Sequence, residues 1–532
     1  MSKALKDEYQ TDYVVGQDNV ARFGFDMHNI VFPFTALLIV LFVIGTLIFP
    51  AASKEMLDGA KNGAIAIFDW GFLLSANLFV LFCLILIFMP IGKIRIGGMD
   101  AKPEFSTLSW FAMLFAAGMG IGLMFWAVAE PVAYYTDWYG TPLGAEPNTP
   151  EGARMAMGAT MYHWGLHPWA IYAIVGLSLS FFAYNKGLPL TIRSAFFPIL
   201  GDRVWGWPGH IIDIVAVLAT IFGLATSLGF GAQQAASGLA YLFDIDGGLN
   251  VQVAIIAGVT AVATISVIRG IEGGVKLLSN ANMMLAAALL FFVFFAGSTL
   301  AIIESIWTTT SAYVANILPL SNPFGREDDA TWFHGWTVFY WAWWISWSPF
   351  VGMFIARVSK GRTVREFVTA VLIIPTVITI VWMSTFGGSA LEQIQNNVGA
   401  LASEGLTDVS LAMFQMLANI PLTAITSFIG IVLVLVFFVT SSDSGSLVID
   451  SITSGGKIDA PKAQRVFWAV TEGAIAAVLL FVGGADALSA LQAGAVSVGL
   501  PFTFVLLVMC YSLLKGLNHE RALLIAEGKL TK

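Results

Sequence analysis

Apolar runs long enough to cross a lipid bilayer recur throughout this chain of 532 residues. Hydrophobic residues make up 57% of the sequence and charged residues only 11%, a composition that soluble globular domains of this size do not have. Because a helix satisfies its own backbone polar groups inside a bilayer, we predict an all-α membrane protein with twelve transmembrane helices. The expected spans cover residues 29–50, 63–91, 107–135, 155–184, 209–242, 251–268, 282–303, 332–356, 366–387, 422–447, 464–483 and 497–515.

The distribution of Lys and Arg predicts how these spans are oriented. If the N-terminus is cytoplasmic, the connections on the inside hold 22 of these residues and those on the outside hold four. Cytoplasmic loops of membrane proteins are enriched in Lys and Arg. We therefore expect a multi-pass protein of the plasma (cytoplasmic) membrane with both termini cytoplasmic. The first 28 residues are polar and lack a small-residue cleavage site, so we expect a cytoplasmic leader and not a signal peptide.

The remaining composition excludes several classes of site. The net charge of −8 is spread over the outside loops and the leader, and neither tail carries a long charge run, so no nucleic-acid partner is expected. Cys83 and Cys510 both lie within apolar spans, which predicts neither a disulfide framework nor a metal site.

The segment from Trp336 to Pro349 is rich in tryptophan. A helix advances about 100° per residue, which places most of its large aromatic residues on one stripe about 16 Å long. The stripe contains Trp336, Tyr340, Trp343, Trp344 and Trp347, while Trp341 points elsewhere. Aromatic faces attract cations, and proteins hold quaternary ammonium groups between them. The alternative is a packing ridge or an interfacial aromatic belt, but a belt lies near a helix end.

The third span contains three glycines in five residues: Gly118, Gly120 and Gly122. Each costs about 1 kcal/mol of helix propensity relative to Ala, so the three together favour local unwinding. Unwound backbone at bilayer depth occurs where it lines a cavity, and many transporters use it to hold ions and substrate carboxylates. Close helix packing through small residues is the alternative.

The fourth span carries a second aromatic cluster, formed by Trp164, Trp169 and Tyr172, with a kink expected at Pro168. His163 and His167 have the i, i+4 spacing of metal ligands. No acidic third ligand stands nearby in the sequence, so structural histidines with satisfied hydrogen bonds are favoured over a metal site.

The tenth span ends in a run of hydroxyl residues around Asp443. An intramembrane carboxylate indicates function by default, and hydroxyls beside backbone carbonyls suit an alkali cation. We favour Thr440 and Ser441 as ligands and Asp443 as an orienting or gating residue. The alternative is a hydroxyl-rich helix end with Asp443 facing the cytoplasm.

These segments resemble the betaine/choline/carnitine transporter (BCCT) family. The similarity includes GMGIGLMFWAVAEP, HWGLHPWAIYA, RGIEGGVKLLSNANM, WAWWISWSPFVGMFIARVSKGRTVREF and VTSSDSGSLVID, and it extends over residues 25–515. The resemblance implies a homotrimer in the lipid bilayer, working by alternating access, with two five-helix repeats of opposite topology (helices 3–7 and 8–12) preceded by two extra helices. The implied divisions are a leader (1–28), two peripheral helices (29–104), a first repeat (105–305), an extracellular connection (306–330), a second repeat (331–515) and a short cytoplasmic tail (516–532).

The resemblance also implies specific site residues. The box for a trimethylammonium group would be Trp164, Trp169, Tyr172 and Trp344, with Trp347 on the inner side of the path. A sodium ion, the coupling ion, would be held by the carbonyls of Ala116, Met119 and Phe437 and the hydroxyls of Thr440 and Ser441. A second sodium site would use Thr220 and Phe350, but this chain has Leu224 where the family has another Thr.

The resemblance leaves the substrate open among small zwitterions. Choline-specialised members place an Asp where this chain has Gly122. A zwitterion brings its own counter-charge, so glycine betaine or its sulfonium analogue dimethylsulfoniopropionate (DMSP) is expected. The alternatives are a sodium-independent exchanger of the carnitine type and choline uptake. A channel, or a membrane enzyme using His163 and His167, conflicts with the repeats and the box. Because both tails are short, strong tail-mediated osmotic activation is not expected.

Overall fold

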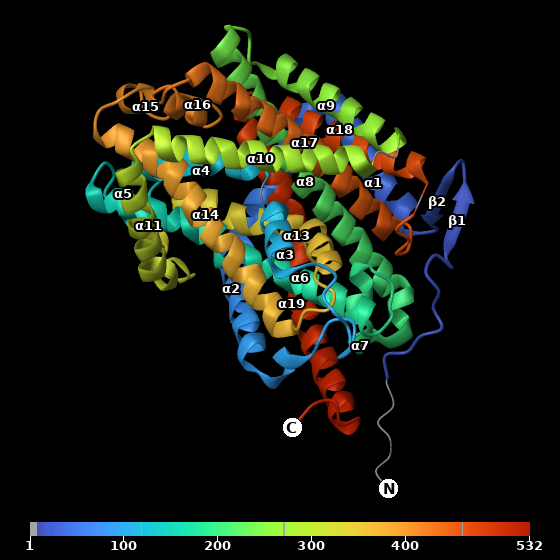
Figure 1. Ribbon diagram of the computed structural model, residues 1–532. Coiled ribbons are helices and arrows are strands. Elements are labelled where there is room, and N and C mark those ends of the chain that lie inside the picture. The colour runs from blue at the N-terminus through green and yellow to red at the C-terminus, as the bar shows by residue number, and fades with distance from the viewer. Residues whose placement is uncertain (1–7, 119, 270–271, 460, 532) are drawn as a thin grey trace.

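The computed structural model describes residues 8–118, 120–269, 272–459 and 461–531 and is almost entirely helical (Figure 1). Its helices are α1 (Val31–Ile48), α2 (Pro50–Phe88), α3 (Thr107–Gly118), α4 (Ile121–Tyr135), α5 (Pro150–Trp164), α6 (Leu166–Tyr184), α7 (Phe197–Leu200), α8 (Trp207–Phe243), α9 (Leu249–Arg269), α10 (Glu272–Ala296), α11 (Thr299–Leu320), α12 (Ala330–Trp332), α13 (Phe339–Val358), α14 (Val364–Gln395), α15 (Ala400–Ser403), α16 (Ala412–Leu417), α17 (Thr423–Thr453), α18 (Lys462–Gly483) and α19 (Ala487–Ala526). Short 3₁₀ segments occupy Pro90–Lys93, Pro142–Gly144, Ile192–Phe196, Gly201–Trp205, Glu327–Asp329 and Gly484–Asp486, and a π-helix occupies Phe333–Val338.

Among the described residues, nine helical stretches are long and apolar enough to cross a membrane. The number is ten if the bent pair α3 and α4 forms one span. One stretch, Lys462–Ala526, joins α18 and α19 through the 3₁₀ turn, and the tryptophan-rich α13 is not among the nine. The prediction of an all-helical, multi-pass membrane protein is confirmed at this level.

The expected span over residues 282–303 is not one helix. Helix α10 ends at Ala296, and α11 begins at Thr299 after a break at Gly297 and Ser298. The apolar run continues across this break into Leu300 and Ile302, so hydropathy alone merges two elements. As a result, much of the predicted connection 306–330 is helical.

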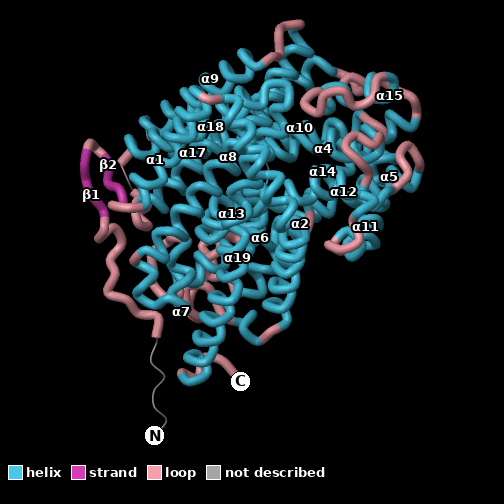
Figure 2. The backbone as a smooth tube through the Cα atoms, turned by 180° about the vertical axis from the view of Figure 1, so that it is seen from behind, coloured by secondary structure: helices cyan, strands magenta, loops and turns pink. Residues whose placement is uncertain are grey.

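The N-terminal segment forms a small antiparallel hairpin of β1 (Asn19–Arg22) and β2 (Phe25–His28), in which Asn19 pairs with His28 (Figure 2). The hairpin contacts the connection between α17 and α18. There the Asn19 side chain donates to the Ser454 carbonyl at 3.0 Å, and Asp26 forms an ion pair with Lys457. The hairpin is thereby joined to the helical bundle.

Helix α13 lies in the middle of the bundle, where it packs against α6, α8, α19 and α3 (Figure 1). Every residue from Phe339 to Pro349 is buried. Since indole and phenol rings bury large apolar areas, this face stabilises the centre of the protein and also places its rings against neighbouring helices.

Two helical breaks lie beside α13. The axes of α3 and α4 differ by 66°, and Gly120 at the start of α4 is extended (φ −163°, ψ −170°). The glycine run therefore interrupts the helix, as predicted.

The second break, between α5 and α6, falls at Gly165 and not at Pro168, where a kink was expected. Pro168 lies in the first turn of α6, where its missing N–H is tolerated. A Cβ at Gly165 would lie 2.6 Å from the Tyr313 hydroxyl, so this close contact requires glycine.

Candidate functional site

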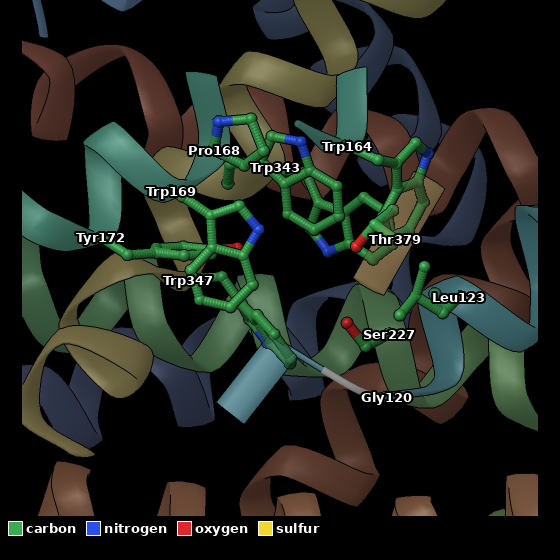
Figure 3. Close-up of a pocket in the computed structure, with 12 residues that line it drawn as sticks. Gly120, Leu123, Trp164, Pro168, Trp169, Tyr172, Ser227, Trp343, Trp347 and Thr379 are labelled. Atoms are coloured by element: carbon green, nitrogen blue, oxygen red, sulfur yellow. The ribbon is translucent and has the colours of Figure 1, made fainter. Parts of the chain in front are cut away.

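A cavity with mostly aromatic walls lies between α4, α5, α6, α8, α13 and α14 (Figure 3). We call it the aromatic cavity. It is lined by Gly120, Gly122, Leu123, Trp164, Pro168, Trp169, Tyr172, Ser227, Trp343, Trp344, Trp347 and Thr379. The structure thus brings together the five aromatic residues that the family resemblance implied, together with Gly120 and Gly122. Of the predicted tryptophan-rich stripe, Trp336 and Tyr340 do not line this cavity. Trp343 of the predicted stripe also lines the wall, and Leu123, Ser227 and Thr379 join it without having been predicted as site residues.

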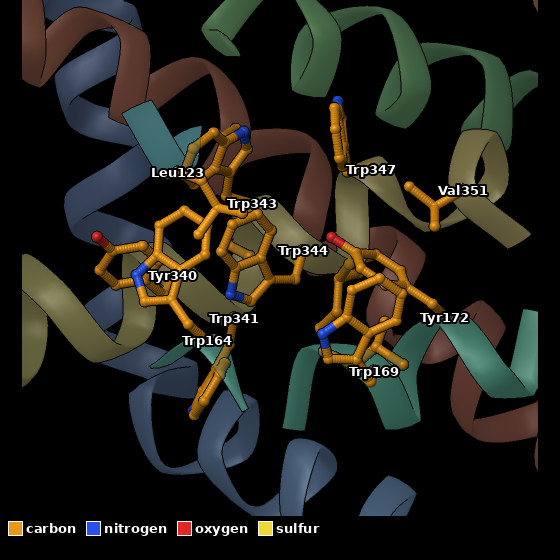
Figure 4. Packing of buried hydrophobic residues seen from close by; sticks show 14 of the residues in the cluster. Leu123, Trp164, Trp169, Tyr172, Tyr340, Trp341, Trp343, Trp344, Trp347 and Val351 are labelled. Carbon is orange, nitrogen blue, oxygen red and sulfur yellow. The ribbon is translucent and has the colours of Figure 1, made fainter. Parts of the chain in front are cut away.

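The rings around the cavity present both faces and edges (Figure 4). Trp343 and Trp344 are stacked, with centroids 4.5 Å apart and planes at 17°. Trp164 meets Trp344 edge to face at 4.8 Å, and Trp169 meets Tyr172 edge to face at 5.4 Å. Because several ring systems converge on one space, positive methyl groups placed there would be close to more than one negative ring face.

None of the described side chains that line the aromatic cavity is charged. The polar side chains among the described lining residues, apart from the indoles, are Tyr172, Ser227 and Thr379. A cation in the cavity would therefore be attracted by the rings but would find no carboxylate on the wall.

Gly122 is required by close packing of the cavity wall. A Cβ at this position would lie 2.9 Å from the outer ring atoms of both Trp164 and Trp343. Any larger side chain must displace two indoles. Gly122 therefore has a steric role in addition to the absence of charge noted from the sequence.

Behind the cavity wall, the Glu130 carboxylate accepts hydrogen bonds from side chains of three helices. Its Oε1 lies 2.9 Å from the Tyr134 hydroxyl and 2.9 Å from His163 Nδ1. Its Oε2 accepts from Trp164 Nε1 at 2.6 Å and from the Tyr340 hydroxyl. All five groups are buried, so the carboxylate orients one indole of the cavity directly.

His163 extends this network to the next indole. Its Nε2 lies 3.0 Å from the Thr337 hydroxyl, and its backbone carbonyl accepts from Trp344 Nε1 at 2.9 Å. His163 is therefore a hydrogen-bonded structural histidine, as favoured from the sequence. His167 Nε2 contacts the Asn77 side-chain oxygen at 3.1 Å, and its ring stacks on Trp341. Within the described part of the chain, no three His, Cys, Asp or Glu side chains are grouped to hold a metal ion.

The role of Glu130 was missed in the sequence analysis. The available signal was a lone carboxylate in the apolar AVAEP stretch, since an ionisable residue within a span indicates function. The pattern could not show which indoles the carboxylate contacts, because those residues are distant in sequence.

A second cavity, which we call the hydroxyl cavity, shares Trp347 with the first. It is lined by Ala116, Ala117, Ser279, Asn282, Met283, Trp347, Phe350, Val351, Phe354, Phe437, Thr440, Ser441 and Ser444. Four of the residues predicted for the first sodium site therefore meet here, and the fifth, Met119, lies outside the described residues. Phe350, predicted for the second site, also lines this cavity, whereas Thr220 does not and donates instead to the Ala216 carbonyl at 2.7 Å.

The hydroxyl run lies inside α17, not at its end, because the helix continues to Thr453. The part of the alternative that placed this run at a helix end is therefore wrong. The Thr440 hydroxyl donates to the Val436 carbonyl at 3.0 Å, which leaves its oxygen lone pairs to accept from or coordinate another group. Asp443 is 3.6 Å from Arg465 of α18.

Comparisons with known proteins agree with this arrangement. The family model for the betaine/carnitine/choline family transporters matches residues 30–522. Glycine betaine transporter 1 of Vibrio parahaemolyticus is 65% identical over 525 residues, which cover 98% of this chain and 100% of that protein. A glycine betaine/proline/choline/ectoine transporter of the same organism is 62% identical over 96% of this chain and 91% of its own length. The glycine betaine transporter OpuD of Bacillus subtilis is 45% identical over 92% of this chain and 94% of its own length.

The aromatic cavity, the broken helix beside it and the match over nearly the whole chain lead to one assignment. The motifs of this chain and its nearly full-length matches all belong to a family of transporters and not of enzymes. This chain belongs to the betaine/carnitine/choline transporter family.

Proposed function

We propose that this protein imports a betaine-type zwitterion, with glycine betaine as the first substrate, by sodium symport and alternating access. The observation that carries this proposal is the aromatic cavity, whose described lining combines several indoles with no charged side chain. The rings suit a trimethylammonium group, for which desolvated cation–π attraction contributes about 2 kcal/mol or more. Relatives at 65% and 45% identity are named as glycine betaine transporters.

The absence of a wall carboxylate favours a zwitterion over choline. A zwitterion carries its own negative group, which can approach the backbone amides at the start of α4, where the helix dipole favours an anion. DMSP presents a sulfonium with the same positive methyl shell and fits the same cavity. Choline is the second candidate, since the relative at 62% identity is named as a transporter of choline, proline and ectoine as well as glycine betaine.

Replacing Gly122 tests this choice of substrate. Gly122→Asp should raise the preference for choline over glycine betaine relative to Gly122→Asn, because only Asp adds a counter-charge beside the rings. Both variants must displace Trp164 and Trp343, so both should weaken glycine betaine binding. Competition between labelled glycine betaine and unlabelled choline measures the preference. Equal preferences in the Asp and Asn variants would contradict the substrate argument.

The hydroxyl cavity supports sodium as the coupling ion. Ala116, Phe437, Thr440 and Ser441 line it, and their carbonyl and hydroxyl oxygens are the hard, neutral ligands that an alkali cation accepts. Met119 completes the proposed set. Among the described residues that line it, none is Lys or Arg. A second sodium ion at Thr220 and Phe350 has less support. Thr220 lies outside this cavity, and this chain has Leu224 where the family has another Thr.

Removing the hydroxyls should weaken the response of uptake to sodium. Thr440→Ala and Ser441→Ala each delete one proposed ligand, so half-saturation should require at least about tenfold more sodium, which corresponds to 1.4 kcal/mol. Ser446→Ala is the matched control, because this buried hydroxyl of the same helix donates to the Asp443 carbonyl and lies outside the cavity lining. Uptake measured at a series of sodium concentrations gives the result. Sodium dependence in Thr440→Ala and Ser441→Ala equal to that of Ser446→Ala would contradict this sodium site, whereas wild-type uptake without any sodium dependence would favour the sodium-independent exchanger.

The proposed architecture has twelve spans, both termini in the cytoplasm of the cell and a homotrimer in the plasma membrane. Counting α13 as a span and dividing Lys462–Ala526 at its 3₁₀ turn raises the ten candidate spans to twelve. The repeats would cover residues 105–305 and 331–515. In support, each begins with an interrupted helix, since α3 and α4 are bent apart and α13 follows a π-helix. Alternating access would open the path on either side of Trp347, which both cavities share.

A further inference from the structure

The Glu472 side chain lies in the middle of α18, within a candidate membrane span, and is completely buried. Neither of its carboxyl oxygens has a hydrogen-bond partner, and no base within the described part of the chain lies within 4.0 Å of them. An ionised carboxylate without a partner costs several kcal/mol in an apolar interior. The surroundings therefore require either a proton or a cation on this group.

The carboxyl lies between α18, α17 and α8. A Cβ added at Gly445 of α17 would lie 3.3 Å from the Glu472 Oε1. The Leu224 side chain of α8 packs against the same glycine. Ser442, one turn before Gly445, lies near the carboxyl, and its buried hydroxyl likewise has no hydrogen-bond partner. Thr260 of α9 contacts the backbone of α18 at Gly473, and its hydroxyl also lacks a partner.

Few charged groups can influence this carboxyl. Arg465 lies two turns earlier on α18, but its guanidinium faces Asp443 at 3.6 Å. Asp443 and Asp450 are the acids of α17. Helix α8 contains no charged residue after Asp213, and α9 contains none before Arg269. The nearest fixed charges therefore leave Glu472 without a counter-ion.

We propose that Glu472 is a proton-binding site, occupied in this conformation, and that its proton opposes cation binding in the hydroxyl cavity. One hydroxyl and one carboxyl are too few ligands for a metal ion, whereas a neutral carboxyl needs only one acceptor, which Ser442 supplies after a small rotation. Ser442 follows Ser441 directly on α17, so loss of the proton places a negative charge close to the proposed sodium ligands. Proton and sodium then bind competitively, and each weakens the other equally.

The first test reads the proton directly and does not depend on the proposed function. Infrared difference spectra of the full-length protein are compared for wild type, Glu472→Gln and Asp443→Asn from mildly acidic to alkaline pH. The wild type should show the C=O band of a protonated carboxyl, and this band should fade as the pH rises. The band should be missing in Glu472→Gln and retained in Asp443→Asn. An identical band in wild type and Glu472→Gln, a band that no pH change removes, or loss of the band in both variants would overturn the proposal.

The second test concerns coupling and rests on the proposed sodium site. Apparent sodium affinity should rise by about twofold to tenfold with pH in wild type, the range expected for one charge acting across several ångströms of protein. In Glu472→Gln this pH dependence should vanish while sodium binding persists. If Glu472→Gln keeps the wild-type pH dependence, the coupling is overturned. Failure of sodium to bind any form would instead overturn the proposed function and leave the infrared result standing.

Discussion

Trp344→Leu is expected to weaken glycine betaine binding by at least tenfold. Trp344 stacks on Trp343 at 4.5 Å, meets Trp164 edge to face at 4.8 Å, and forms part of the cavity wall. Leucine keeps the site apolar but removes the ring face that attracts the trimethylammonium group. Loss of about 1.4 kcal/mol, less than one desolvated cation–π contact, already corresponds to tenfold. Binding can be followed by intrinsic tryptophan fluorescence or by equilibrium binding of labelled substrate.

The matched control is Trp341→Leu. Trp341 lies on the same helix and is equally buried, but it contacts Tyr162 and His167 and does not line the cavity. This variant should lose stability, as a large-to-small change in a core does, while keeping its affinity. Tight binding in Trp344→Leu would mean that the tryptophan stripe is packing and not a binding surface.

Glu130→Gln should reduce glycine betaine affinity by about tenfold or more, even though residue 130 does not line the cavity. The native carboxylate accepts from Tyr134, His163, Trp164 and Tyr340. An amide offers only one oxygen and turns its NH₂ group toward existing donors, which leaves at least one buried donor unpaired at a cost of about 1–3 kcal/mol. The Trp164 indole is then free to turn, so the cavity loses its shape. Affinity is measured in folded, monodisperse protein.

Glu366→Gln removes the same charge without touching the cavity, because Glu366 is exposed and caps α14 through Thr363. Affinity in this control should be unchanged. If Glu130→Gln bound glycine betaine as tightly as Glu366→Gln, Glu130 would have no part in positioning the cavity wall.

The sequence alone predicted most of the aromatic cavity because two separate aromatic clusters carried visible signals. Tryptophan at helical spacing in α13, and the cluster around Trp164 and Trp169, identified residues that the fold brings into contact. The glycine run predicted the break between α3 and α4 for the same reason, since helix propensity is a local property.

Other features depended on contacts that a pattern does not contain. In the sequence, Glu130 is a single acidic residue in an apolar run, and only the fold shows its four hydrogen-bond donors. The need for glycine at position 165 depends on the close approach of Tyr313, which is far away in sequence. The division between α10 and α11 was missed because apolar residues continue across Gly297. The interior position of Asp443 was obscured because polar residues in α17 look like a helix end.

The most direct measurement is uptake of labelled glycine betaine into proteoliposomes containing the purified protein, with and without an inward sodium gradient and in the presence of choline, carnitine or DMSP. Sodium-dependent accumulation, inhibited by DMSP more strongly than by choline or carnitine, is the result that the proposed mechanism predicts. Accumulation that is indifferent to sodium, with exchange against preloaded substrate, would contradict symport and would make the hydroxyl run of α17 a structural feature.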